Sequence, residues 1–133
     1  MEVKRMTQEQ VFTVEYNAKV HLTAENIDDI MVCALEGGIN YWCRKVKVVG
    51  EYFGEYASEQ ISRGGSLVLY DAESSDKWEL TRDKFLKGFQ LWLENDTDTY
   101  YGVDEHELDT SVIDGTAADF IVQYALFGEV VFG

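Results

Sequence analysis

The sequence predicts an α+β domain: a mostly antiparallel sheet of about four to six strands, with two or three helices packed on one face. Apolar and polar residues alternate with period two over 11–23, which is typical of a half-buried strand. Apolar residues recur at helical spacing over 82–94 and 116–127. Because no Gly-, Ser- or Pro-rich linker interrupts the chain, we expect residues 1–133 to form a single acidic α+β domain.

The first half of the chain predicts a strand, a helix and a second strand. The alternation over 11–23 predicts one continuous strand. Thr23 then has the position of a helix N-cap, and the two glycines at 37–38 end that helix. Residues 39–49 are rich in β-branched and aromatic side chains and predict a strand, with a bulge near Lys45 where the alternation slips.

The second half predicts six further segments from apolar periodicity, caps and turn residues. In order, these are an aromatic loop or strand with one helical turn at 50–65, a hairpin at 66–70 and 77–80, a helix at 82–94, a polar surface loop at 95–113, a helix at 116–127 and a short last strand at 129–132.

The charge of the chain is strongly negative and unevenly distributed. The formal net charge is −14, and residues 88–133 contain ten acids and no Lys or Arg. Such a field repels nucleic-acid phosphates and anionic membranes. We therefore expect no direct nucleic acid and no membrane as partners, and a basic protein surface as the favoured partner.

Enzymatic and metal chemistry find little support in the sequence. Only His21 and His106 could act as imidazole bases, and no nucleophile elbow or phosphate-binding loop is present. Cys33 and Cys43 are too far apart for a redox pair, so we expect free thiols. Residues 96–107 have acids at three ligand positions of a calcium loop, but they have tyrosine at the position where the sharp turn requires glycine. The sequence leaves open whether this loop binds a cation. We expect no catalytic residue, no metal site and no cofactor.

Two candidate sites remain. The first is a ligand site in which aromatic faces, an amide and guanidinium groups surround a planar or phosphorylated ligand, and its candidate residues are Asn40, Tyr41, Trp42, Arg44, Arg63, Gly64 and Gly65. The second is an acidic face that mimics a phosphate track and binds a basic groove on another protein, and its candidate residues are Glu94, Asp96, Asp98, Asp104, Glu105, Glu107 and Asp109.

Four segments resemble small acidic proteins encoded in prophages and integrative mobile elements of anaerobic Gram-positive bacteria. These segments are residues 34–43 (sequence ALEGGINYWC), 62–73, 84–93 and 121–133. The resemblance implies a context of accessory genes, in which inhibitors of host defence are common, and a location in the bacterial cytoplasm. It implies no activity and no catalytic residue.

The leading prediction is a non-enzymatic interaction protein that inhibits or sequesters a basic, nucleic-acid-binding host or defence protein, as a DNA mimic or an anti-CRISPR factor would. One alternative is a small-ligand binder, such as a sponge for a nucleotide signal. Another is a structural or assembly component of a phage particle, which would form stable oligomers. The sequence leaves homo-oligomerisation open.

Overall fold

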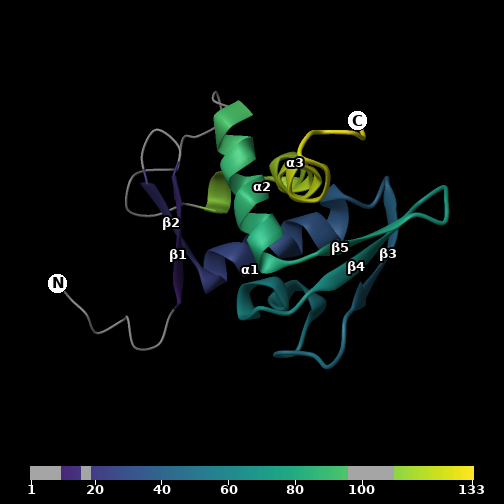
Figure 1. Cartoon of the computed structure of the whole chain (residues 1–133), viewed down its shortest axis with the longest axis horizontal. Coiled ribbons are helices and arrows are strands. Elements are labelled where there is room, and N and C mark those ends of the chain that lie inside the picture. Colours follow the sequence, from purple (N-terminus) through teal and green to yellow (C-terminus); the bar gives the residue numbers. More distant parts are fainter. Residues whose placement is uncertain (1–9, 16–18, 96–109) are drawn as a thin grey trace.

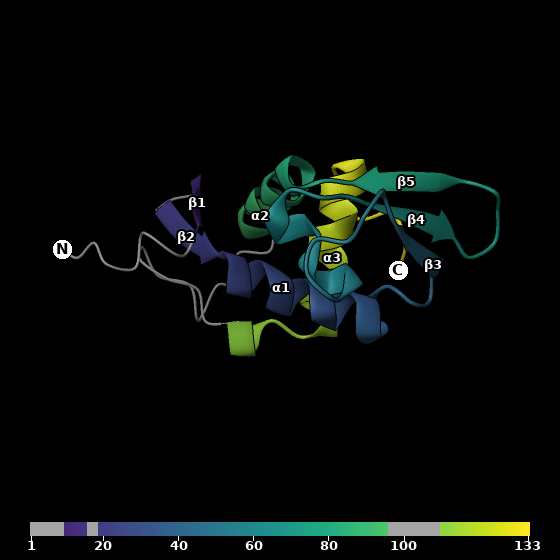
Figure 2. The same cartoon turned by 90° about the horizontal axis from the view of Figure 1, so that it is seen from below.

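The computed structural model describes residues 10–15, 19–95 and 110–133 and has an α+β fold (Figure 1). Three helices lie between two separate β-sheets, and both views agree on this arrangement (Figures 1 and 2). In chain order the elements are β1 (Val11–Glu15), β2 (Lys19–Thr23), α1 (Ala24–Cys33), β3 (Cys43–Val48), β4 (Leu67–Asp71), β5 (Lys77–Leu80), α2 (Arg82–Asn95) and α3 (Gly115–Phe127).

The prediction of a single sheet is wrong. The described strands form a two-stranded sheet (β1-β2) and a three-stranded sheet (β3-β4-β5), both antiparallel. The predicted strand over 11–23 is a hairpin in which Val14 pairs with Val20 and Phe12 with Leu22. This register keeps residues of the same parity on one face, so the alternation continues across both strands. Periodicity alone could not distinguish the hairpin from one long strand.

The three-stranded sheet agrees more closely with the sequence. The hairpin of β4 and β5 is confirmed, and so is the bulge, which lies between Cys43 and Lys45. The strand predicted over 39–49 begins only at Cys43, because residues 39–42 form a turn in which the amides of Trp42 and Cys43 both donate to the carbonyl of Ile39.

The helices begin and end where the caps predict. The Oγ1 of Thr23 accepts a hydrogen bond from the Asn26 amide at 3.0 Å, and the Asn26 side chain accepts one from the Thr23 amide. Thr81 caps α2 in the same way through the Lys84 amide. α2 and α3 cross at Gly88, where a Cβ would lie 2.5 Å from the Ala125 nitrogen, so the two backbones are in direct contact.

One hydrophobic core includes residues from both sheets and from all three helices. Its largest fully buried side chains include Leu22, Ile30, Leu69, Phe85 and Phe89. No helix in the described part of the chain is both long and apolar enough to cross a membrane.

Candidate functional site

Two residues of the predicted ligand site, Tyr41 and Trp42, belong to a hydrogen-bond network centred on Asp119 of α3. The Asp119 carboxylate is only 3% exposed. It accepts hydrogen bonds from Trp42 Nε1 at 2.7 Å, from the Tyr41 hydroxyl at 2.6 Å and from Gln123 Nε2 at 2.9 Å. Burial, together with the hydrogen bond to Asp119, raises the pKa of Tyr41 to about 12.

The same network fixes residues 129–132, which do not form the predicted last strand. Gln123 is fully buried, and its Oε1 accepts hydrogen bonds from the amides of Val131 and Phe132 at 2.7 and 2.8 Å. Phe132 stacks on Trp42, with ring centroids 5.0 Å apart and planes 7° apart. Because a side chain satisfies these backbone amides, no neighbouring strand is needed.

Two cavities lie beside Tyr41, and both are lined by carboxylates. An open groove of about 670 Å³ includes Glu36 and Asp114 in its lining, and a smaller cavity of about 280 Å³ includes Asp71 and Glu73. Neither is lined by Arg44 or Arg63, so they lack the cations that an anionic ligand requires. Their charge favours a cation, contrary to the phosphorylated ligand that the sequence suggested.

The remaining residues of the predicted ligand site lie apart from these cavities. The amides of Gly64 and Gly65 donate to the carbonyls of Ile61 and Gln60, so neither is free to bind a phosphate. Arg63 forms ion pairs with Asp28 and Glu59. Asn40 is exposed, and Arg44 lies on the outer side of the three-stranded sheet, over the Tyr70 ring.

The predicted acidic face falls mostly outside the described residues. Glu94 is exposed at the end of α2. Asp96, Asp98, Asp104, Glu105, Glu107 and Asp109 lie outside the described ranges, as do His106 and the loop that resembles a calcium site.

The structure gives little support for metal or thiol chemistry. In residues 10–15, 19–95 and 110–133, no group of three or more His, Cys, Asp or Glu side chains could hold a metal ion. Cys33 and Cys43 are both free. Burial raises the pKa of each thiol, so both are protonated, weak nucleophiles at neutral pH.

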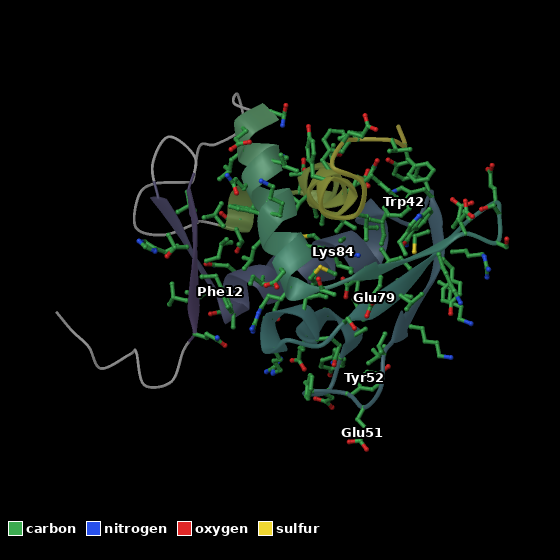
Figure 3. All side chains as sticks on the ribbon, viewed as in Figure 1. Phe12, Trp42, Glu51, Tyr52, Glu79 and Lys84 are labelled. Atoms are coloured by element: carbon green, nitrogen blue, oxygen red, sulfur yellow. The ribbon has the colours of Figure 1, made fainter. Side chains whose placement is uncertain are left out.

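Among the described residues, four of the exposed large apolar side chains lie in the segment 49–56, here called the aromatic loop. It follows β3 and projects from the edge of the molecule, where Figure 3 shows Glu51 and Tyr52. Tyr52, Phe53 and Tyr56 are 57%, 49% and 60% exposed, and Val49 is 45% exposed. Contiguous exposed apolar side chains on a small domain mark interaction sites.

The aromatic loop has a fixed shape because a buried glutamine binds its backbone. Gln60 is fully buried. Its Oε1 accepts from the Phe53 amide at 2.8 Å, and its Nε2 donates to the carbonyls of Phe53 and Tyr56 at 2.7 and 2.8 Å. Gly54 turns the chain with a φ of 76°, a conformation that other residues rarely adopt.

The carboxylate of Glu59 also binds the backbone of the loop. Glu59 Oε1 accepts hydrogen bonds from the amides of Glu55 and Tyr56 at 2.7 and 3.2 Å, and these bonds lower the pKa of Glu59. Two 3-10 turns, Ala57–Glu59 and Ile61–Arg63, follow the loop, and the second is fixed to α1 because Ser62 Oγ donates to Asp28 at 2.7 Å. The loop is thus connected to the core through two successive turns.

The surroundings of the aromatic loop combine apolar surface with negative charge. Beside Tyr56 lies a recess of about 310 Å³, lined also by Val32, Leu35, Glu36 and Ser58. Glu51 and Glu55 are exposed within the loop itself. This surface therefore offers aromatic side chains and an apolar recess with carboxylates at its border, which suits an apolar protein surface that carries basic groups.

Sequence reasoning noted aromatic residues over 50–65 but did not identify them as a site. Gly50 and Gly54 flank aromatic residues that show no alternation of apolar and polar side chains. This combination is the sequence signal that could have indicated the site. The role of Gln60 could not be predicted, because it depends on a buried side chain reaching the loop backbone.

The fold and the site together define an α+β domain that displays a rigid, acid-bordered aromatic loop. Comparisons with known protein families, with curated proteins and with solved structures find no match to this chain.

Proposed function

We propose that this chain is a non-enzymatic interaction protein that captures a basic partner protein, with nucleic-acid-binding proteins as the partner class. The aromatic loop is the observation that carries the proposal. It presents Tyr52, Phe53 and Tyr56 to solvent in a backbone held by Gln60 and Glu59. Tyrosine and other aromatic residues are the usual anchors of protein interfaces.

The rigidity of the loop supports a role in binding. A flexible loop loses conformational entropy when it docks, and this loss weakens the complex. In this protein the conformation is already fixed by five hydrogen bonds between the side chains of Gln60 and Glu59 and the backbone of residues 53, 55 and 56, at 2.7 to 3.2 Å. The aromatic side chains can therefore contribute most of their contact energy to affinity.

The charge supports a basic partner. Glu36, Glu51 and Glu55 border the apolar surface, and the whole chain carries a net charge of −14. Such a field accelerates the encounter with a basic surface and lowers the affinity as salt screens it. Nucleic-acid-binding grooves have the required charge, and an acidic protein seated in one would block access of the nucleic acid.

The binding of purified basic nucleic-acid-binding proteins tests this proposal. At low ionic strength we expect at least one member of a panel to bind the intact chain, and we expect the affinity to fall with added NaCl. The double variant Tyr52→Ala/Tyr56→Ala should bind about tenfold or more weakly, because it removes two interface anchors. The measurement is calorimetry or surface plasmon resonance.

The matched control is Val131→Ala, which truncates an apolar side chain that is 53% exposed at a distant surface, and it should bind like the wild type. Circular dichroism should show that all three proteins are folded. The proposal fails if no panel member binds at low salt, or if the double tyrosine variant binds as tightly as the control.

A further inference from the structure

A second surface, with the opposite charge, lies on the outward face of the three-stranded sheet. Its cross-strand row is Lys45, Tyr70 and Lys77, and Lys47 lies in the next row. The bulge directs Arg44 to the same face, so that the charged groups of Arg44, Lys45 and Lys77 lie 5.4, 5.1 and 6.0 Å from the centroid of the Tyr70 ring. We call the surface formed by Arg44, Lys45, Lys47, Lys77 and Tyr70 the cationic face.

In the described residues no carboxylate forms an ion pair with the cations of this face, although Glu79 lies in the same cross-strand row as Lys47. The pKa of Asp71 is lowered by hydrogen bonds and, to a smaller extent, by the charge of Arg44. Arg44 donates to the backbone carbonyl of Asp71 rather than to a carboxylate, and none of the four cations forms an ion pair within the described ranges. This differs from Arg63, which pairs with two carboxylates. Three exposed cations that converge on one tyrosine repel one another, and an anionic ligand would relieve that repulsion.

The shape of the surface favours an extended ligand. The cationic residues lie on a sheet face, and none of the three cavities described above includes them in its lining. β3 is an outer strand of its sheet, since the strand order is β3-β4-β5 (Figure 1). A peptide that adds to this edge would place alternate side chains beside Lys45 and Lys47, which are two residues apart on one face.

We propose that the cationic face binds an extended acidic peptide segment, with carboxylates at alternate positions, along the edge of β3. A single-stranded nucleic acid fits less well for two reasons. The cations lie over the only aromatic ring of the face, so that ring is not free to stack on bases. A long polyanion would also extend beyond the face and meet the field of a chain with net charge −14.

Lysines on outer strands also have a purely structural role, because they prevent two copies from pairing edge to edge. The two roles predict different results when the lysines are replaced. If the lysines only prevent pairing, the wild-type chain does not bind the acidic peptide, and charge reversal changes only its self-association. If the cationic face is a binding site, charge reversal removes an existing affinity.

The test uses the full chain and a fluorescein-labelled peptide of about ten residues in which Glu alternates with Thr. Fluorescence anisotropy at low salt should show binding that NaCl weakens. The double variant Lys45→Glu/Lys47→Glu should bind about tenfold more weakly, whereas Lys84→Glu/Lys87→Glu, with the same charge change on α2, should lose less than about twofold. A peptide of the same composition with its glutamates in one block should bind more weakly than the alternating one.

Three results would overturn the proposal: no binding of the alternating peptide at low salt, an equal loss in both double variants, or tighter binding of a thymidine oligonucleotide of equal charge. The inference is independent of the aromatic loop. The Tyr52→Ala/Tyr56→Ala variant should keep full affinity for the acidic peptide, so failure at one surface is distinguishable from failure at the other.

Discussion

At the scale of single residues, Asp119 has the largest structural consequence. It is a buried carboxylate that accepts hydrogen bonds from three neutral donors, namely Trp42, Tyr41 and Gln123. Through Gln123 it also determines where residues 131–132 lie. Removing this acceptor leaves the buried donors of Trp42 and Gln123 without it, which costs more than the bonds contribute when they are intact.

Tyr41→Phe should change how stability depends on alkaline pH. The pKa of Tyr41 is raised from 10.0 to about 12 in the folded chain. Between these values the unfolded chain has released the proton that the folded chain still holds, so this group makes the folded state less stable as the pH rises. Removing the hydroxyl should cost about 1 kcal/mol at neutral pH and make the decline from pH 10 to 12 shallower.

Urea unfolding of both proteins at pH 8, 10, 11 and 12 checks this prediction, because the other tyrosines and the lysines titrate alike in the two proteins. The difference in unfolding free energy should narrow as the pH rises. Two curves that remain parallel throughout this range would show that Tyr41 titrates in the folded state as it does in the unfolded state.

At the scale of elements, the contact between α2 and α3 determines how closely the two helices approach. Gly88 lies on the buried stripe of α2 with Phe85, Phe89 and Trp92, directly against the backbone of Ala125. The close packing of α2 against α3 therefore requires a residue without a Cβ at position 88.

Gly88→Ala should destabilise the fold by about 1–3 kcal/mol. Alanine is favoured over glycine within a helix by about 1 kcal/mol, but its Cβ would lie 2.5–2.7 Å from three atoms of Ala125, two of which are backbone atoms that cannot move independently. Thermal and urea unfolding measure the change. Lys87→Ala, an exposed neighbour on the same helix, is the control and should be nearly neutral; a stabilised Gly88→Ala would contradict the described helix contact.

The local elements were largely predictable, and the long-range contacts were not. N-cap residues and apolar residues at helical spacing predict the three helices, because each of these signals lies within a few neighbouring positions of the sequence. The alternation over 11–23 predicts one strand, whereas the structure has the paired strands β1 and β2, because their register preserves the alternation. The local pattern around Tyr41 and Trp42 predicts ligand contacts, but their partner Asp119 is 78 and 77 positions away, respectively, and no local pattern indicates that they meet.

At the scale of the whole molecule, charge opposes folding and favours association with basic surfaces. The chain holds 25 acidic and 11 basic residues, and four of the basic ones form the cationic face. Compaction brings like charges together, so the excess of negative charge lowers stability at low ionic strength.

Adding NaCl from about 0.01 M to about 0.5 M should therefore raise the melting temperature, because the screening length shortens from roughly 30 Å to a few ångströms. The same salt series should weaken the proposed complex with a basic partner. At pH 5, where carboxylates begin to take up protons, the rise should be smaller. A melting temperature that stays constant or falls with NaCl at neutral pH would show that repulsion among the negative charges does not significantly lower the stability of the fold. Scanning calorimetry provides the measurement.

The way Gln60 and Glu59 hold the aromatic loop has an evolutionary consequence. Their hydrogen bonds to the loop are made to main-chain atoms of residues 53, 55 and 56. The side chains at 51, 52 and 55 are exposed and take no part in those bonds. Substitutions at these three positions can accumulate while the loop keeps its shape. If the loop binds a partner as proposed, a few such substitutions would be enough to change that partner, and the same positions are suited to a randomised library.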